Sequence, residues 1–217
     1  MTELGSRVER RKQQTRQRMV SAGRTLLETE GLDGLSIQGV TAEADVALGT
    51  FYNHFAGKEA LIEEIVTEDD LRDLAAAKAL TGTNCAPMRH LTALVAVTVS
   101  SGLVDSRWAA AVSNLSRHRH WPGVLLRSAI RDILSLDSES CETGERNDTA
   151  DKLDLLAEVI SEILSGSLRA ISEQPSLATT DIIVRHAVYT SLLVAGVDRC
   201  ACEAESEWAL ELPIDLR

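Results

Sequence analysis

The side chains best suited to chemistry lie in one segment, residues 36–58, with the sequence SIQGVTAEADVALGTFYNHFAGK. The polar groups of its second half, residues 48–58, are two hydroxyls, an amide, an imidazole and an ammonium, carried by Thr50, Tyr52, Asn53, His54 and Lys58. Hydroxyl, imidazole and ammonium groups donate to phosphate oxygens, and an asparagine amide can pair with adenine. Gly49 adds no bulk between them, so the backbone can approach phosphates closely. This segment therefore predicts contacts to DNA.

Two short helices joined by a tight turn must position these groups. The first is expected from Ser36 to Ala44, with the Ser36 hydroxyl as N-cap. Asp45 is expected in the turn with a positive φ, which Asp tolerates better than most residues. The second helix is expected to run to about Phe55 with its phenylalanines facing inward. Such a pair is a helix-turn-helix, whose second helix enters the DNA major groove.

A third helix is expected to begin at Lys58, where the ammonium, the free N–H groups and the helix dipole can meet one phosphate. Seven Lys/Arg against two Asp/Glu in residues 1–27 extend the basic character toward the N-terminus. The basic residues of this arm can lie along phosphates or in the minor groove, namely Arg7, Arg10, Arg11, Lys12, Arg16 and Arg18. A solvated, charged helix end is an equal alternative for the first few of them. The predicted contacts of the helix-turn-helix are Ser36, Gln38, Leu48, Gly49, Thr50, Tyr52, Asn53, His54 and Lys58.

Residues 40–61, VTAEADVALGTFYNHFAGKEAL, resemble the signature of the TetR (tetracycline-repressor) family of bacterial transcription regulators. The matching positions are Ala44, Val46, Gly49, Thr50, Phe51, Tyr52, His54, Phe55, Lys58, Glu59 and Leu61. Asp45 replaces the usual Gly, and Ala47 replaces the usual Ser, which removes a helix cap and a phosphate contact. The resemblance covers roughly residues 12–66 and implies a dimeric, ligand-responsive regulator, most often a repressor of a palindromic operator.

An all-α fold of about nine helices is expected, with a DNA-binding domain over residues 1–57 and a regulatory domain over 58–217. The long helices are expected at 9–30, 58–80, 87–103, 106–117, 122–136, 150–172 and 179–202. The helices near residues 90–115 are apolar on most faces and belong in the interior of the body. The acidic run Glu68-Asp69-Asp70 is interpreted as a solvated face.

The family resemblance implies a small-molecule pocket in this body, although the residues alone do not show one. Trp108 and Trp121 are the candidate aromatic walls, and His90, Asn114 and Arg117 are candidate polar anchors. Core packing is the alternative role for both tryptophans. The resemblance also implies that the last two long helices pair with their copies in a homodimer. The interface residues expected there are Leu156, Ile160, Ile163, Ser167, Ile182, Tyr189, Leu193 and Gly196.

Composition sets the remaining bounds on function. The net charge is −11, but the excess of acid lies in residues 61–217, so a basic head on an acidic body can still bind DNA at one focused site. No long apolar run or secretory signal is visible, which favours a cytoplasmic protein without a membrane segment. The four cysteines lack zinc spacing and are expected to be free thiols.

Catalysis is disfavoured because the expected constellations are missing from the sequence. It contains no Glu-x-x-His pair, phosphate loop, His-Glu-x-x-His or G-x-S-x-G motif, so no catalytic residue, metal or cofactor is predicted.

Oxidant sensing through Cys200 and Cys202 is an alternative that is compatible with DNA binding, and the simpler interpretation is two thiols near a helix end.

Overall fold

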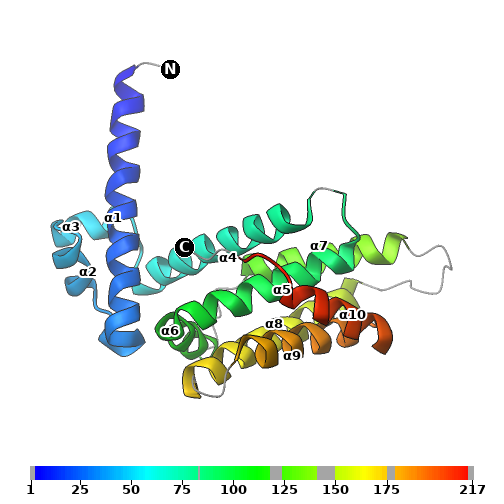
Figure 1. Cartoon of the computed structure of the whole chain (residues 1–217). Coiled ribbons are helices and arrows are strands. Elements are labelled where there is room, and N and C mark those ends of the chain that lie inside the picture. Colours follow the sequence, from blue (N-terminus) through cyan, green and yellow to red (C-terminus); the bar gives the residue numbers. More distant parts are fainter. Residues whose placement is uncertain (1–2, 83, 118–123, 141–149, 175–178, 215–217) are drawn as a thin grey trace. The chain divides into compact units, whose positions relative to one another are not determined.

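Helices make up all the regular structure in the described part of the chain. The computed structural model describes residues 3–82, 84–117, 124–140, 150–174 and 179–214, and these ranges hold ten helices and no strand (Figure 1). The predicted all-α class is therefore confirmed. The helices are α1 Glu3–Gly34, α2 Ile37–Glu43, α3 Leu48–Tyr52, α4 Lys58–Thr81, α5 Pro87–Val104, α6 Ser106–Arg117, α7 Val124–Ser140, α8 Ala150–Glu173, α9 Thr180–Val194 and α10 Arg199–Leu210.

The chain divides into two units, Met1–Glu68 and Asp69–Arg217. The division falls inside α4, whereas the sequence placed a domain boundary after residue 57. The first turns of α4 therefore belong to the N-terminal unit, and its remaining turns belong to the C-terminal unit.

The N-terminal unit packs α1, α2, α3 and the first turns of α4 around a small apolar core. Met19, Phe51 and Ile65 are fully buried in it. Gly23 in α1 permits a close approach to α4, because a Cβ there would lie 2.9 Å from Cδ2 of Leu61. Gly31 has the positive φ of 72° expected of a helix-ending glycine, and one further helical turn then reaches Gly34.

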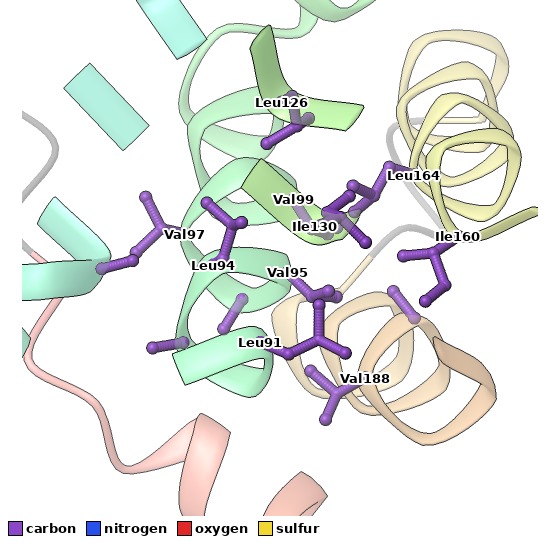
Figure 2. Packing of buried hydrophobic residues seen from close by; sticks show 14 of the residues in the cluster. Leu91, Leu94, Val95, Val97, Val99, Leu126, Ile130, Ile160, Leu164 and Val188 are labelled. Atoms are coloured by element: carbon purple, nitrogen blue, oxygen red, sulfur yellow. The ribbon is translucent and has the colours of Figure 1, made fainter. Parts of the chain in front are cut away.

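The C-terminal unit is built around α5, which packs against α6, α7, α8, α9 and α10. Ten consecutive residues of α5, from Leu91 to Ser100, are buried, as its apolar sequence predicted. Figure 2 shows Leu94 and Val95 of α5 among Ile130 of α7, Ile160 of α8 and Val188 of α9. None of the helices in the described ranges, α5 included, has the length and apolar character needed to cross a membrane.

The helix predicted over 179–202 is two helices, α9 and α10, so the count of nine is corrected to ten. Gly196 adopts a φ of 87°, which ends α9 in the left-handed region. Asp198 then caps α10, because its carboxylate accepts hydrogen bonds from the backbone N–H groups of Cys200 and Ala201. The helical spacing of apolar residues continues across the break between α9 and α10, so this spacing alone predicted a single helix.

Candidate nucleic-acid interface

The caps and the turn of the helix-turn-helix follow from its local sequence. The Ser36 hydroxyl oxygen accepts a hydrogen bond from the Gly39 N–H at 3.0 Å and caps α2. Asp45 has a φ of 50°, as the turn requires. Ala47 sits at the N-cap of α3 with extended backbone and provides no side-chain hydrogen bond. These expectations of the sequence are confirmed, including the missing cap.

The two faces of α3 differ sharply in burial. Phe51 and Phe55 are buried, and their ring centroids lie 5.4 Å apart. Leu48 and Tyr52 remain 46% and 57% exposed. Gly49 and Asn53 are also exposed, Thr50 is half-buried, and Gln38 is exposed on α2. The helix ends at Tyr52 rather than near Phe55, but the backbone N–H groups of His54 and Phe55 still donate to the Phe51 carbonyl.

His54 is less available than its place in the sequence suggested. The side chain is half-buried, and its Nδ1 is buried without a hydrogen-bond partner. Burial lowers the pKa of His54, and the positive charges of Arg16 and Lys12 lower it further. These effects favour the neutral imidazole in the chain without DNA.

Lys58 is half-buried at the start of α4, and its ammonium already has one internal partner. Its Nζ donates to the carbonyl oxygen of Leu32, near the end of α1, at 2.6 Å. An ammonium has three N–H donors, so two remain for the predicted phosphate contact. The internal bond fixes the position of the group beside the N-terminus of α4.

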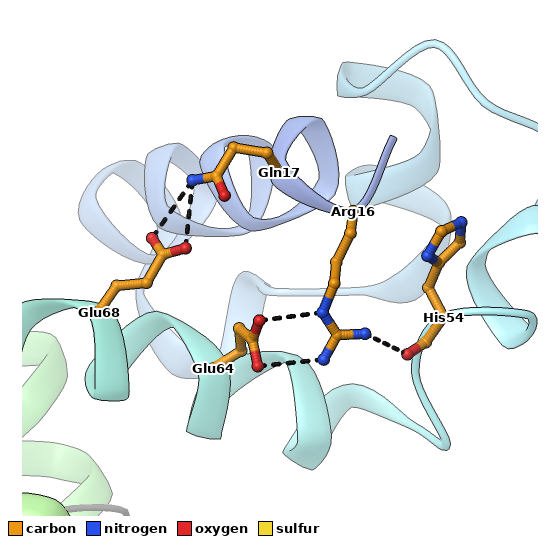
Figure 3. Close-up of polar contacts among 5 residues, drawn as sticks. All are labelled: Arg16, Gln17, His54, Glu64 and Glu68. Carbon is orange, nitrogen blue, oxygen red and sulfur yellow. Dashed lines mark hydrogen bonds and ion pairs between the residues drawn. The ribbon is translucent and has the colours of Figure 1, made fainter. Parts of the chain in front are cut away.

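Arg16 and Arg18, which the sequence assigned to the DNA-binding arm, make intramolecular contacts. Arg16 donates to both carboxylate oxygens of Glu64 and to the carbonyl of His54, as Figure 3 shows. Arg18 donates to the carbonyl of Ala44 at the end of α2. A run of arginines on one helix does not show which side chains face protein and which face solvent. The sequence therefore could not predict the internal contacts of Arg16 and Arg18. Arg7, Arg10, Arg11 and Lys12 are exposed on α1, which begins at Glu3 rather than near residue 9 as predicted.

Comparisons with known proteins agree with this geometry. The sequence model of "Bacterial regulatory proteins, tetR family" matches residues 19–65, which hold the C-terminal half of α1, the helix-turn-helix and the start of α4. Residues 19–65 therefore carry a TetR-family helix-turn-helix region. The chain is 36% identical over 63 residues to the HTH-type transcriptional regulator UidR of Escherichia coli (strain K12), covering 29% of this chain and 32% of UidR. It is 40% identical over 53 residues to the HTH-type transcriptional repressor DhaR of Mycobacterium sp. (strain GP1), covering 24% and 27%.

The chain thus spans about a third or less of the length of these relatives, and the matches cover less than a third of this chain. The fold is shared over almost the whole chain. The structure of RolR in complex with resorcinol has a TM-score of 0.69 at 22% identity and covers 91% of this chain and 95% of RolR. A gamma-butyrolactone receptor (ArpA-like protein) has a TM-score of 0.55 at 19% identity and covers 93% and 98%.

The candidate ligand residues of the C-terminal unit are only partly described. Trp108 is half-buried and packs against the apolar core. The Nδ1 of His90 lies 2.9 Å from the Thr81 hydroxyl, and burial lowers the pKa of His90. Trp121 and the side chains of Asn114 and Arg117 lie outside the described residues. The structure thus brings His90 to the end of α4 rather than into a shared cluster with Trp108.

The acidic segment of α4 was wrongly interpreted as a solvated face, because Asp69 and Asp70 are only 9% and 7% exposed. Asp69 pairs with Arg72 at 2.7 Å, and Asp70 accepts a hydrogen bond from the Leu126 N–H of α7. Asp73, one turn on, accepts from the Ser101 hydroxyl of α5 at 3.0 Å. Burial raises the pKa of Asp70 to about 7 and that of Asp73 to about 6.

The predicted dimer residues differ in burial and fall into three groups. Ile160 is fully buried within the single chain, so it cannot present its side chain to a partner, and Leu156 and Tyr189 also pack against that core. Ile182 and Leu193 of α9 are 60% and 42% exposed. The remaining members, Ile163 and Ser167, are half-buried, and Gly196 is exposed in the turn after α9. Two further apolar side chains of α8 are exposed, Leu155 at 63% and Val159 at 37%.

The two cysteines of α10 have opposite environments. Cys202 is fully buried, with its thiol directed to the Val197 carbonyl, and Cys200 is exposed. Burial raises the pKa of Cys202, which keeps it a thiol at neutral pH. This arrangement supports a packing role for Cys202 and gives no support to paired redox chemistry.

Proposed function

We propose that the chain is a DNA-binding transcriptional regulator that acts in the cytoplasm as a homodimeric repressor of a palindromic operator and is released by a small-molecule effector. The observation that carries this proposal is the division of α3 into a buried aromatic face and an exposed face bearing Leu48, Tyr52 and Asn53. The aromatic face fixes the helix, and the exposed face is free to enter a major groove.

Each exposed group of this face has a suitable role in the groove. Tyr52 can donate its hydroxyl to a phosphate, and Asn53 can read a base edge. Apart from its chain neighbours and the nearby backbone of α3, no atom lies within 4 Å of the position where a Cβ of Gly49 would stand, so the backbone there is open to a phosphate. The proposed contact set is completed by Ser36, Gln38, Thr50, His54 and the two remaining donors of Lys58.

Dimerisation would follow from the apolar side chains that α8 and α9 leave exposed. Leu155, Val159, Ile182 and Leu193 are large apolar residues exposed to water, and contiguous exposed apolar surface marks interaction sites. A twofold dimer would place two copies of α3 about 34–36 Å apart, in successive major grooves of a palindrome.

An effector site in the C-terminal unit is supported by the likeness in fold to RolR, whose structure contains resorcinol, and to a gamma-butyrolactone receptor. Both names refer to small organic ligands. We propose a ligand of that size class for this chain, bound among the helices that surround α5. A coupling of about 1–3 kcal/mol between effector and operator would be typical of such control.

The test is the affinity for a DNA fragment from upstream of the chain's own gene, measured by fluorescence anisotropy across a salt series. We expect selective binding that weakens steeply with salt, because phosphate contacts release counterions. Tyr52→Ala should weaken binding, whereas Leu136→Ala, an equally exposed change on α7, should not. Binding that ignores both the DNA sequence and Tyr52 would contradict the proposal.

A further inference from the structure

Arg16 makes polar contacts with two separate parts of the N-terminal unit. Its Nε and one terminal nitrogen donate to the two carboxylate oxygens of Glu64 in α4, at 2.9 and 3.0 Å. The other terminal nitrogen donates to the carbonyl oxygen of His54 at 2.6 Å. Figure 3 shows the guanidinium between these two partners, with one edge toward each. The same group lies over the Phe55 ring, 4.3 Å from its centroid.

The two partners of Arg16 belong to different elements of the N-terminal unit, α4 and the end of α3. Glu64 lies in the part of α4 that packs in this unit, and the His54 carbonyl follows directly after the last turn of α3. Carbonyls at the C-terminal end of a helix lack internal partners and carry partial negative charge, so a guanidinium there satisfies both needs. Arg16 thus bridges α4 and the end of the recognition helix.

The chemistry of this bridge requires an arginine. A guanidinium offers five N–H donors in a rigid planar fork, which lets one side chain bind a carboxylate with two bonds and a carbonyl with a third. A lysine ammonium at the same place would keep the charge but could not hold both partners in the same fixed geometry. The side chains of Arg16 and Glu64 are each about one-third exposed, so the pair is partly shielded from water.

We propose that Arg16 is a positioning residue for DNA binding, which fixes the C-terminal end of α3 against α4 without itself neutralising a phosphate. The inference rests on the proposed function, since it takes α3 as the element that enters the groove. It assigns to Arg16 a role opposite to the phosphate contact that its place in the basic arm predicted.

The neighbouring residue supplies a matched control. Gln17 also joins α1 to α4, because its amide donates to Glu68 at 3.1 Å, but it makes no described contact with α3 or the turn after it (Figure 3). Gln17→Ala therefore removes an α1–α4 contact and leaves the end of α3 supported. Arg16→Lys keeps the charge and removes the fork, and Glu64→Gln removes the charged partner and leaves Arg16 free to hold His54.

The first measurement is operator affinity across a salt series for the unaltered chain, for these three variants and for Arg16→Ala. Arg16→Lys should weaken binding about 10- to 100-fold, as the loss of charge-assisted hydrogen bonds would predict, while the slope of log affinity against log salt stays unchanged. Glu64→Gln should weaken it less, and Gln17→Ala should bind as the unaltered protein does. An unweakened Arg16→Lys variant would overturn the inference. So would an Arg16→Ala variant whose slope falls by about 0.9, the change expected when one phosphate contact is lost.

The second measurement needs no DNA and separates this inference from the proposed function. Amide hydrogen exchange of His54 and Phe55, whose N–H groups bond to the Phe51 carbonyl, should accelerate in Arg16→Lys and not in Gln17→Ala. Unchanged exchange would show that Arg16 does not hold the end of α3. If the unaltered protein binds no DNA selectively, the proposed function fails. If that protein binds and Arg16→Lys binds equally well, only the role of Arg16 fails.

Discussion

The carboxylate of Asp70 in α4 accepts a hydrogen bond from the backbone N–H of Leu126 in the first turn of α7, at 3.2 Å. The acceptor thus satisfies one of the free N–H groups at the N-terminus of a helix that begins 54 residues later, at Val124. A negative charge at that end also meets the positive pole of the helix dipole. The cost is the burial of a carboxylate that is only 7% exposed, with Asp69 and Asp73 as its nearest acidic neighbours.

The burial of the Asp70 carboxyl group predicts that the stability of the C-terminal unit falls as the pH rises. Burial, with the neighbouring acids, raises the pKa of Asp70 from its ordinary value of 3.8 to about 7. Between these two values the folded chain keeps a proton that the unfolded chain loses. The free energy of unfolding therefore decreases from about pH 4 to pH 7 and stays low above it. At about 1.4 kcal/mol per pKa unit, the full effect is on the order of a few kcal/mol.

The measurement is urea denaturation of the full chain and of Asp70→Asn at several values between pH 5 and pH 8. Asn keeps an oxygen for the Leu126 N–H but carries no charge, so the variant should be more stable than the native chain at pH 8 and about equal to it at pH 5. Asp73→Asn should show the same trend with a lower midpoint, since its pKa is about 6. A difference between Asp70→Asn and the native chain that does not vary with pH would contradict the burial argument.

The helix-turn-helix could be predicted almost completely because its signals are local. The cap at Ser36, the positive φ at Asp45 and the inward phenylalanines each depend on residues within one turn of one another. The roles of Asp70 and Arg16 could not be predicted in this way. Their partners Leu126, Glu64 and His54 lie 38 or more residues away, and an acidic run or a basic run has the same sequence whether it faces water or protein.

The break between α9 and α10 is a different case, since its signal was present in the sequence. Gly196 and Asp198 are a helix-ending residue and a helix-capping residue at the right spacing. The apolar residues on both sides kept a helical period, which favoured one long helix. Capping residues deserve more weight than periodicity at such positions, because a glycine in the left-handed region and a filled N-cap each stabilise a helix end directly.

The uncapped N-terminus of α3 predicts a stabilising substitution. Ala47 has the extended backbone of an N-cap residue, with φ −70° and ψ 148°, and no side-chain acceptor. Ala47→Ser should supply that acceptor and stabilise the N-terminal unit by about 1 kcal/mol. Ala42→Ser, an exposed change inside α2, is the matched control and should destabilise by about 0.5 kcal/mol. Amide exchange of the buried helices of this unit measures both; equal effects of the two serines would contradict a capping role.

Burial separates core residues from interface residues among the predicted dimer set. Ile160→Ala should lower the free energy of unfolding by about 2–5 kcal/mol, because Ile160 is fully buried within one chain. Leu155→Asp combined with Ile182→Asp should leave the fold of each chain intact and weaken self-association, since both side chains are largely exposed. Sedimentation equilibrium and urea denaturation separate these effects. A dimer that survives the double change would show that these faces of α8 and α9 are not the interface.

The geometry of α10 predicts that oxidation leaves DNA binding unchanged. Cys200 and Cys202 are two residues apart on one helix, so their Cβ vectors point to different sides and cannot close a disulfide without distortion. Cys200 is exposed, and Cys202 is fully buried with a raised pKa. A thiol reagent should therefore modify Cys200 in the folded chain and reach Cys202 only on unfolding.

Peroxide treatment checks this prediction, with DNA affinity followed in parallel and Cys200→Ser as the control. A reversible loss of affinity that disappears in Cys200→Ser would instead assign a sensing role to the exposed thiol.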